Sequence, residues 1–335
     1  MNRYLLKFSL STAAVICAYF AVVLYVPGPI KAEYWVHELI VIKRYEAAAL
    51  PSPKIIFVGG SSTLFNVDAA RMSHELNVPV MNAGLHAGLR LDRILEEASR
   101  LAQHGDNVIL TLEQPYYACN NGQWTDWQLD NTLAWDHSDF DRLSFMTRVG
   151  IVFNSGSPSL AVDILTNYVR TVINPERMLD RLDSLAPDDE IFSRYLSGVK
   201  RTKSFVYSAY NIDDHGMIEM NEGAHFEGMA IASSLPDGIC AAQAQVLATF
   251  IAAMKARSVK VSLAYVPYLI EGEVDESWRK ADASFRADVA ALNVPLIGAR
   301  EDGFMDRAKF YNTQLHLNTN GRKVYTDNLI AEMRK

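Results

Sequence analysis

The chain has 335 residues, of which 49% are hydrophobic and 21% are charged, and its formal net charge is −7. This composition is typical of a folded globular protein, and the length allows one large α/β core with a sizeable insertion. The sequence contains no basic run, which argues against nucleic acid as a partner.

The first 30 residues differ in kind from the rest. Arg3 and Lys7 precede the uncharged stretch 8–26, which as a helix would be about 28 Å long, close to the thickness of a bilayer core. We expect 1–30 to be a cytoplasmic tip with a single-pass anchor in the cytoplasmic (inner) membrane. The positive residues then place 31–335 on the extracytoplasmic, periplasmic side. A cleaved signal peptide and a buried globular helix are the alternatives.

Residues 31–53 are expected to form a helical stem that ends at Pro51 and Pro53. Strand and helix patterns then alternate. The expected strands are 54–58, 78–82, 107–112, 260–266 and 294–297, and the expected helices are 66–76, 89–104, 241–257, 275–292 and 323–333. This alternation predicts an α/β fold of three layers, a parallel sheet with helices on both faces.

The alternation breaks at about 118–237, which we interpret as an insertion or lid within one domain spanning 54–335. Inside it the patterns predict helices at 160–172 and 188–199 and a hairpin at 205–220. The aromatic residues in and just before this region are either a sugar-stacking platform or ordinary core residues: Tyr116, Tyr117, Trp124, Trp127 and Trp135.

Cys119 and Cys240 lie at the two ends of this middle region. Outside the cytoplasm disulfides persist, so the two residues could form a bridge. The alternative is a pair of free, half-buried thiols.

A hydroxyl-bearing turn follows the first strand, where the sequence reads Gly59-Gly60-Ser61-Ser62. A nucleophile at the carboxyl end of a parallel strand lies in the crevice where α/β folds bind ligands. The glycines allow a sharp turn, and the N–H groups of the following helix suit a developing oxyanion. The alternative role of these hydroxyls is helix capping.

Two further segments point to the same crevice. Asn82-Ala83-Gly84 follows the second strand, and His316 precedes the last helix. With Gly60-Ser61-Ser62, these segments resemble the sequence blocks of the SGNH, or GDSL-like, hydrolase superfamily. The resemblance covers 54–115 and 238–330.

The resemblance implies roles for individual residues. Ser62 would be the nucleophile and His316 the general base that accepts its proton. The N–H groups of Ser62 and Gly84 would form the oxyanion hole, with Gly60 and Asn82 beside them. No cofactor is implied.

Two positions depart from the family pattern. Thr313 stands where the family has an aspartate that orients the histidine, so we expect Asn312 to orient it. An amide fixes the imidazole tautomer but does not stabilise imidazolium as a carboxylate does. Glu113 and Gln114 stand where the family has a Gly-x-Asn oxyanion donor. Either Glu113 points elsewhere, Gln114 donates instead, or the site has lost hydrolysis.

Other motifs carry less weight. The sequence has no Gly-x-Ser-x-Gly elbow and no phosphate-binding glycine loop. His215 beside Asp213 and Asp214 is better explained as a solvated turn than as a metal site, so no metal is expected.

The sequence therefore predicts an extracytoplasmic serine esterase or O-acyltransferase, of the membrane-anchored type that acetylates exopolysaccharides. It would act on a polysaccharide or cell-wall glycan beside a membrane acyltransferase or a polysaccharide synthesis complex. The alternatives are a catalytically inactive glycan-binding or scaffold protein of such a complex and a secreted esterase or lipase for small substrates.

Overall fold

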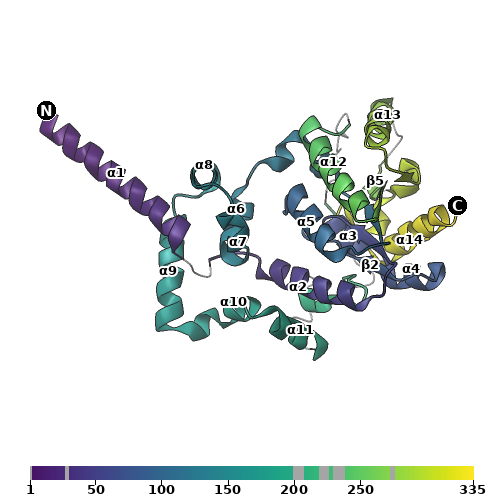
Figure 1. Ribbon diagram of the computed structural model, residues 1–335, viewed down its shortest axis with the longest axis horizontal. Helices are drawn as coiled ribbons and strands as arrows, with labels where there is room; N and C mark the ends of the chain where they lie inside the picture. Colours follow the sequence, from purple (N-terminus) through teal and green to yellow (C-terminus); the bar gives the residue numbers. More distant parts are fainter. Residues whose placement is uncertain (1, 27–29, 199–206, 219–225, 229–237, 272–275) are drawn as a thin grey trace. The chain divides into compact units, whose positions relative to one another are not determined.

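The computed structural model describes residues 2–26, 30–198, 207–218, 226–228, 238–271 and 276–335 (Figure 1). The chain divides into two compact units, one made of Met1–Glu38 and Gln123–Ile191 and the other of Leu39–Gly122 and Phe192–Lys335. This division differs from the expected insertion at 118–237 of a single domain. The middle of that region groups with the N-terminal segment, and the chain from residue 192 onward belongs to the sheet-containing unit.

The larger unit contains a five-stranded parallel sheet in the order β2-β1-β3-β4-β6. Its strands are β1 Ile55–Val58, β2 Val80–Asn82, β3 Asn107–Leu110, β4 Lys260–Ala264 and β6 Leu296–Ile297. Each lies inside a predicted strand, so the parallel α/β sheet is confirmed. The central strands are buried along nearly their whole length, which explains their continuous apolar runs.

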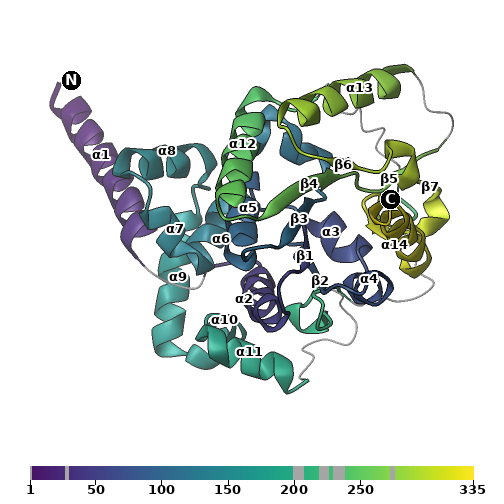
Figure 2. The ribbon, with the colours of Figure 1, turned by 45° about the vertical axis from the view of Figure 1, so that its right-hand side comes forward.

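Helices cover both faces of this sheet (Figure 2). On one face, α4 Ala69–Leu76 and α14 Thr319–Met333 pack against strand residues such as Phe57 and Ile109. On the other face, α5 Leu91–Leu101 contacts β1 and α12 Ala241–Ala256 contacts β4. Alternate strand residues point to opposite faces, so each helix layer has its own apolar partners.

The chain after β1 forms two helices instead of the single one predicted at 66–76. α3 Ser61–Asn66 begins directly at the end of the strand, and α4 follows after Asp68. The Asp68 carboxylate caps α4 by accepting from the Arg71 N–H at 3.0 Å. The prediction therefore missed the helix that carries the serines.

A buried lysine on the stem helix, α2 Tyr34–Ala49, holds the loop that follows β2. The Lys43 ammonium group donates to the carbonyl oxygens of Asn82 at 2.9 Å and Gly84 at 2.5 Å. Complete burial lowers the pKa of Lys43 well below its ordinary value. Arg44 adds a two-pronged ion pair with Glu97 of α5.

The remaining elements of the larger unit are short, apart from one helix. They are α13 Glu276–Ala291, β5 Tyr268–Leu269, β7 Phe304–Met305, β8 Phe310–Thr313 and β9 His316–Leu317. The predicted hairpin at 205–220 has one antiparallel bridge, between Ile212 and Ile218. Residues 205–206 and 219–220 of that prediction lie outside the described residues.

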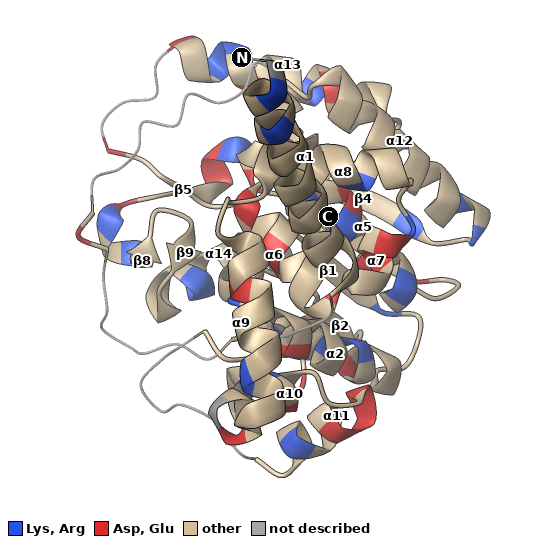
Figure 3. Cartoon of the chain, turned by 90° about the vertical axis from the view of Figure 1, so that its left-hand side faces the viewer, with Lys and Arg blue, Asp and Glu red and all other residues tan. Residues whose placement is uncertain are grey.

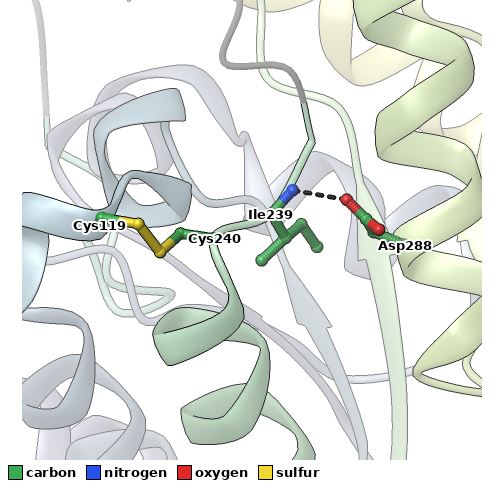
Figure 4. The surroundings of a disulfide bond; sticks show 4 residues. All are labelled: Cys119, Ile239, Cys240 and Asp288. Carbon is green, nitrogen blue, oxygen red and sulfur yellow. Dashed lines mark hydrogen bonds between the residues drawn. A yellow bond between two sulfur atoms is a disulfide. The ribbon is translucent and has the colours of Figure 1, made fainter.

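Cys119 and Cys240 form a disulfide, which confirms the bridge over the pair of free thiols (Figure 4). Their Cα atoms are 5.2 Å apart, and the sequence separation is 121 residues. Beside it, the Ile239 N–H donates to the Asp288 carboxylate at 2.7 Å. The bridge ties the start of α12 to the segment that follows β3.

The smaller unit is helical. Its elements are α1 Asn2–Tyr25, α6 Asp126–Trp135, α7 His137–Asp141, α8 Phe145–Ser155, α9 Leu160–Ile173 and α10 Leu179–Ser184. They share a core that includes Leu24, Leu129, Phe140, Val152 and Ile164. α11 Asp188–Leu196 begins at the boundary between the units.

α1 is long and apolar enough to cross a membrane. The segment Arg3–Tyr25 has 23 residues and a mean hydropathy of 2.0. Its charged side chains lie near the N-terminal tip, and the rest of the helix carries none (Figure 3). These properties fit a single-pass anchor.

The aromatic residues considered for a sugar platform are core or framework residues. Tyr116 and Tyr117 are buried in the larger unit. Trp124 and Trp135 pack on the core of the smaller unit, and the Trp127 indole donates to Glu33 at 3.1 Å. These contacts favour the core interpretation.

Candidate active site

Three segments meet at the carboxyl end of the sheet. α3 starts after β1, Glu113 follows β3, and His316 lies in β9 just before α14. Since β1 and β3 are neighbours and β2 lies on the outer side of β1, the strand order reverses direction at this point. Crevices at such points are where open α/β sheets bind ligands.

The structure brings Ser61, His316 and Asn312 into one hydrogen-bonded chain. His316 Nε2 lies 2.8 Å from Ser61 Oγ, and His316 Nδ1 lies 2.8 Å from Asn312 Oδ1. A hydroxyl, an imidazole and an orienting side chain in this order form the arrangement of a nucleophile, its base and a third group. Asn312 therefore contacts the histidine in the way predicted for it.

The orientation of Asn312 sets the tautomer of the histidine. Its Nδ2 donates to the Tyr207 hydroxyl at 2.9 Å, so its Oδ1 faces the imidazole as an acceptor. His316 Nδ1 must then carry the proton, which leaves the Nε2 lone pair to accept from Ser61. Tyr207, which the sequence did not single out, is thus part of the positioning network.

The imidazole is buried and uncharged. Its ring stacks on Phe65 with the centroids 4.2 Å apart, and the His316 side chain is nearly inaccessible to solvent. Burial and, to a smaller extent, the electrostatic effect of nearby His86 together lower the pKa of His316 to about 3. The group is therefore a free base at neutral pH.

The structure places Ser62 away from the base, which corrects its assignment as the residue paired with His316. Ser62 Oγ accepts from Asn66 Nδ2 at 2.8 Å. Both serines lie in the first turn of α3, where adjacent residues point about 100° apart. The prediction placed Ser61 in a turn. In the structure Ser61 is the first residue of α3, and its hydroxyl is turned toward His316.

Asn66 ties α3 to the histidine segment. Besides Ser62, it donates to the Leu315 carbonyl at 2.8 Å, and its Oδ1 accepts from the Leu317 N–H at 2.7 Å. These contacts flank His316 on both sides along the chain. Asn66 is a positioning residue that the sequence pattern marked only as a helix start.

Glu113 occupies the N–H groups at the start of α3. Its two carboxylate oxygens accept from Ser62 N–H at 2.7 Å and from Gly60 N–H at 3.0 Å. No side chain of its own turn caps α3, so this glutamate, which follows the neighbouring strand β3, satisfies the N–H groups at the helix start. Burial raises the pKa of Glu113, opposed by these N–H donors.

The Gly84 N–H is also engaged, since it donates to Asn82 Oδ1 at 2.9 Å. A β-carbon at Gly84 would lie 2.2 Å from the Leu64 nitrogen, so the glycine is required by close packing on α3. Asn82 Nδ2 donates to the carbonyls of Thr63 and Val67 and so holds the end of α3. The predicted oxyanion hole of Ser62 and Gly84 N–H groups therefore differs from the structure, in which both have acceptors.

The two other predicted positions have distinct surroundings. A β-carbon at Gly60 would lie within 2.8 Å of the Glu113 carboxylate and the Tyr116 hydroxyl, so any other residue would require these side chains to shift. Gln114 lines a cavity with Tyr117, Tyr265 and Arg300. Among the described residues its buried Nε2 has no partner, and no contact joins it to Ser61.

No protein-family model matches this chain, and a search of curated proteins finds no similar protein. The chemistry must therefore be argued from the site itself. Within the described ranges, no group of three or more His, Cys, Asp or Glu side chains could hold a metal ion. His215 instead contacts the Asp214 carboxylate at 2.9 Å in the turn.

The arrangement suits proton transfer coupled to nucleophilic attack. Ser61 is held against a neutral imidazole whose far nitrogen is fixed, which is the geometry of an activated hydroxyl. The Ser61 N–H lies at the first position of α3, where a backbone N–H has no acceptor within the helix. Because that N–H belongs to the residue that carries the hydroxyl, it is a candidate donor to an oxyanion formed at Ser61.

Proposed function

We propose that this protein is a serine esterase or O-acyl (acetyl) transferase that works through an acyl-enzyme on Ser61. The observation that carries the proposal is the chain Ser61–His316–Asn312, with 2.8 Å between each contacting pair of atoms. The resemblance of its sequence blocks to the SGNH hydrolases supports the same chemistry, with the nucleophile moved by one residue.

In the proposed reaction, His316 Nε2 takes the Ser61 proton as Oγ attacks the acyl carbon. The tetrahedral intermediate collapses, the bond to the leaving oxygen breaks, and that oxygen takes the proton from His316. Water or a sugar hydroxyl then repeats the sequence in reverse and restores Ser61. Asn312 holds the imidazole tautomer throughout but offers no charge to stabilise imidazolium.

Glu113 sets a condition on this mechanism. An ionised carboxylate on the N–H groups of Gly60 and Ser62 would oppose a developing oxyanion beside it. The raised pKa of Glu113 favours its neutral form over a wider pH range than for an ordinary glutamate. A neutral Glu113 removes the repulsion, so the acid form is the one compatible with acyl transfer.

Helix α1 is long and apolar enough to span a membrane, which supports a substrate near a membrane. We propose a glycan or an acylated polymer on the extracytoplasmic (periplasmic) side, handled with a membrane acyltransferase or a polysaccharide synthesis complex. The support is the length and hydropathy of α1, with Arg3 and Lys7 at its tip.

A second function is favoured by a specific observation. Glu113 and Asn82 occupy the N–H groups of Ser62 and Gly84, where the resemblance expects an oxyanion to bind. A protein in which these donors are permanently engaged would be a catalytically inactive glycan-binding or scaffold member of a synthesis complex.

The test uses the full-length protein in detergent with p-nitrophenyl acetate. We expect a burst of p-nitrophenol and an acetyl adduct that peptide mass spectrometry maps to Ser61. The adduct should be lost in Ser61→Ala and His316→Ala and retained in Ser62→Ala, the matched control one residue away. No adduct on the folded wild-type protein, together with no phosphonate labelling, would favour the scaffold function.

A further inference from the structure

One side of α9 carries an exposed apolar stripe. Six of its side chains are 44–76% exposed, namely Val162, Leu165, Tyr168, Val169, Val172 and Ile173. At 3.6 residues per turn they cover an arc of about 140°. This stripe, which we call the α9 stripe, lies beside the face that packs into the core through Leu160, Ile164 and Asn167. The buried Ala161, in the first turn, lies within the same arc as the stripe.

The rest of the helix circumference is polar. Asp163, Thr166 and Arg170 lie side by side in projection and are exposed. The helix therefore has a core face, a polar face and the α9 stripe. A helix on the surface of a water-soluble protein needs only the first two, so the stripe calls for an apolar surrounding.

The neighbouring helix α8 has the same property. Phe145 is 51% exposed, Met146 is 73% exposed and Phe153 is 77% exposed. The core of α8, through Ile151 and Val152, belongs to the same cluster as that of α9. Large exposed apolar side chains thus recur on the two helices.

These helices pack against the outer end of the membrane-spanning helix. The Tyr19 hydroxyl donates to the Ser157 carbonyl at 2.8 Å, in the loop between α8 and α9. Val23 and Leu24 are buried in the cluster that also contains Val152 and Ile164. All of these contacts lie within the smaller unit.

The contact sets the depth of α9. Arg3–Tyr25, at 1.5 Å per residue, is about 34 Å long, close to the ~30 Å hydrocarbon core. The segment from Tyr19 to Tyr25 then occupies roughly the outermost 10 Å of the span. The part of α9 that packs on that segment then lies near the boundary between acyl chains and headgroups.

We propose that the α9 stripe is embedded in the outer part of the lipid bilayer, beside the point where α1 leaves it. The stripe would contact lipid hydrocarbon, because it adjoins α1, whose exposed apolar surface also requires lipid around it. The polar face with Asp163, Thr166 and Arg170 would meet headgroups and water, as in helices that lie in the interface. The smaller unit is thus a platform fixed on the membrane by two elements, α1 and α9.

The experiment uses the full chain in liposomes of phosphatidylcholine and phosphatidylglycerol. A nitroxide is attached to Val169→Cys on the stripe or to Thr166→Cys on the polar face, each in a Cys17→Ser background. Cys119 and Cys240 are paired and do not react. Spin-label accessibility to oxygen and to a water-soluble nickel chelate then reports depth.

We expect the oxygen-to-nickel accessibility ratio to be several-fold higher at position 169 than at position 166. A label on the native Cys17, which is exposed on α1, is the reference for the bilayer interior. Val172→Cys should repeat the result of Val169→Cys, so one poorly folded variant does not decide the test.

Three results would overturn the proposal. One is equal, water-like accessibility at 166, 169 and 172. Another is protection of positions 169 and 172 from both reagents, which would mean that a second copy of the chain covers the stripe. The third is a water-exposed Cys17, which would remove the membrane on which the argument depends.

Discussion

His316 Nε2 lies 2.8 Å from Ser61 Oγ, whereas the hydroxyl of the next residue, Ser62, accepts from Asn66 Nδ2 at the same distance. The two adjacent serines therefore have different tasks. Ser61 faces the base, and Ser62 supports the asparagine that holds the base's segment in place.

Replacing Asn66 by alanine should lower both stability and acylation rate. The change leaves the Leu315 carbonyl and the Leu317 N–H without a partner, at about 1–3 kcal/mol for each buried group. Ser62→Ala removes one acceptor and should cost only about 0.5–1.5 kcal/mol, with acylation retained. Urea unfolding and the p-nitrophenol burst measure the two effects. A folded Ser62→Ala protein without a burst would contradict the assignment of Ser61.

Asn312→Asp should make the base stronger. An opposite charge at the distance of Asn312 Oδ1 raises a histidine pKa by about 1–3 units and stabilises imidazolium. We expect faster acylation. In serine proteases the reverse change, from aspartate to asparagine, lowers the rate by a factor of about 10⁴, which sets an upper bound on the gain. The burst rate against pH measures both quantities, and Asn312→Ala is the control without either hydrogen bond. An unchanged rate in Asn312→Asp would mean that imidazolium formation does not limit the step.

The acylation rate should be nearly independent of pH on the acid side of neutrality. Because the pKa of His316 is lowered to about 3, the base stays neutral from pH 7 to pH 5. The neutral fraction of a histidine with the ordinary pKa of about 6.5 would fall about 25-fold between pH 7 and pH 5. The initial acylation rate should therefore change little across this range. An inflection near pH 6.5 would show that the imidazole is more solvated than the structure indicates.

The same group links stability to pH. A folded-state pKa below the unfolded value means that stability is present above about pH 6.5 and is lost as the pH falls toward 3. His316→Gln lacks this titration, so the wild-type protein should lose stability relative to it on acidification. Urea unfolding of both proteins at several pH values gives the difference, and a constant difference would contradict the burial of a neutral imidazole.

Glu113 should make stability depend on pH in the opposite direction to His316. Its pKa is raised in the folded state, so the unfolded chain releases the proton first and stability falls as the pH rises above the ordinary glutamate range. Within the window between the two pKa values, the wild-type protein should lose about 1.4 kcal/mol per pH unit relative to Glu113→Gln. Denaturant titrations between pH 4 and pH 8 measure this slope. A difference that grows in favour of the wild type with rising pH would show that the N–H donors outweigh burial.

Removing the disulfide should destabilise the larger unit. The bridge closes a loop with a sequence separation of 121 residues, for which the chain-entropy estimate is about 5 kcal/mol and typical losses are about 2–5 kcal/mol. The Cys119→Ser/Cys240→Ser variant should unfold at a lower urea concentration, as should the reduced wild-type protein. Identical midpoints before and after reduction would contradict a bridge in the protein.

The sequence by itself determined the features that depend on local pattern. The alternation of apolar strands and amphipathic helices indicated the parallel sheet, and the uncharged run near the N-terminus indicated a helix able to span a membrane. His316 and Asn312 were proposed as partners through the resemblance to the SGNH blocks, in which the orienting residue precedes the histidine within one short segment, and they lie in contact. In each case the signal is contained in a few consecutive residues.

Tertiary structure decided which hydroxyl faces the base. Ser61 and Ser62 are chemically alike, and the choice depends on where α3 begins. That start is set by Glu113, which follows β3, and the far end of α3 is held by Asn82 of β2. These strands are brought beside α3 only by sheet pairing. Because adjacent residues in a helix point about 100° apart, that long-range capping determines which serine is turned toward His316.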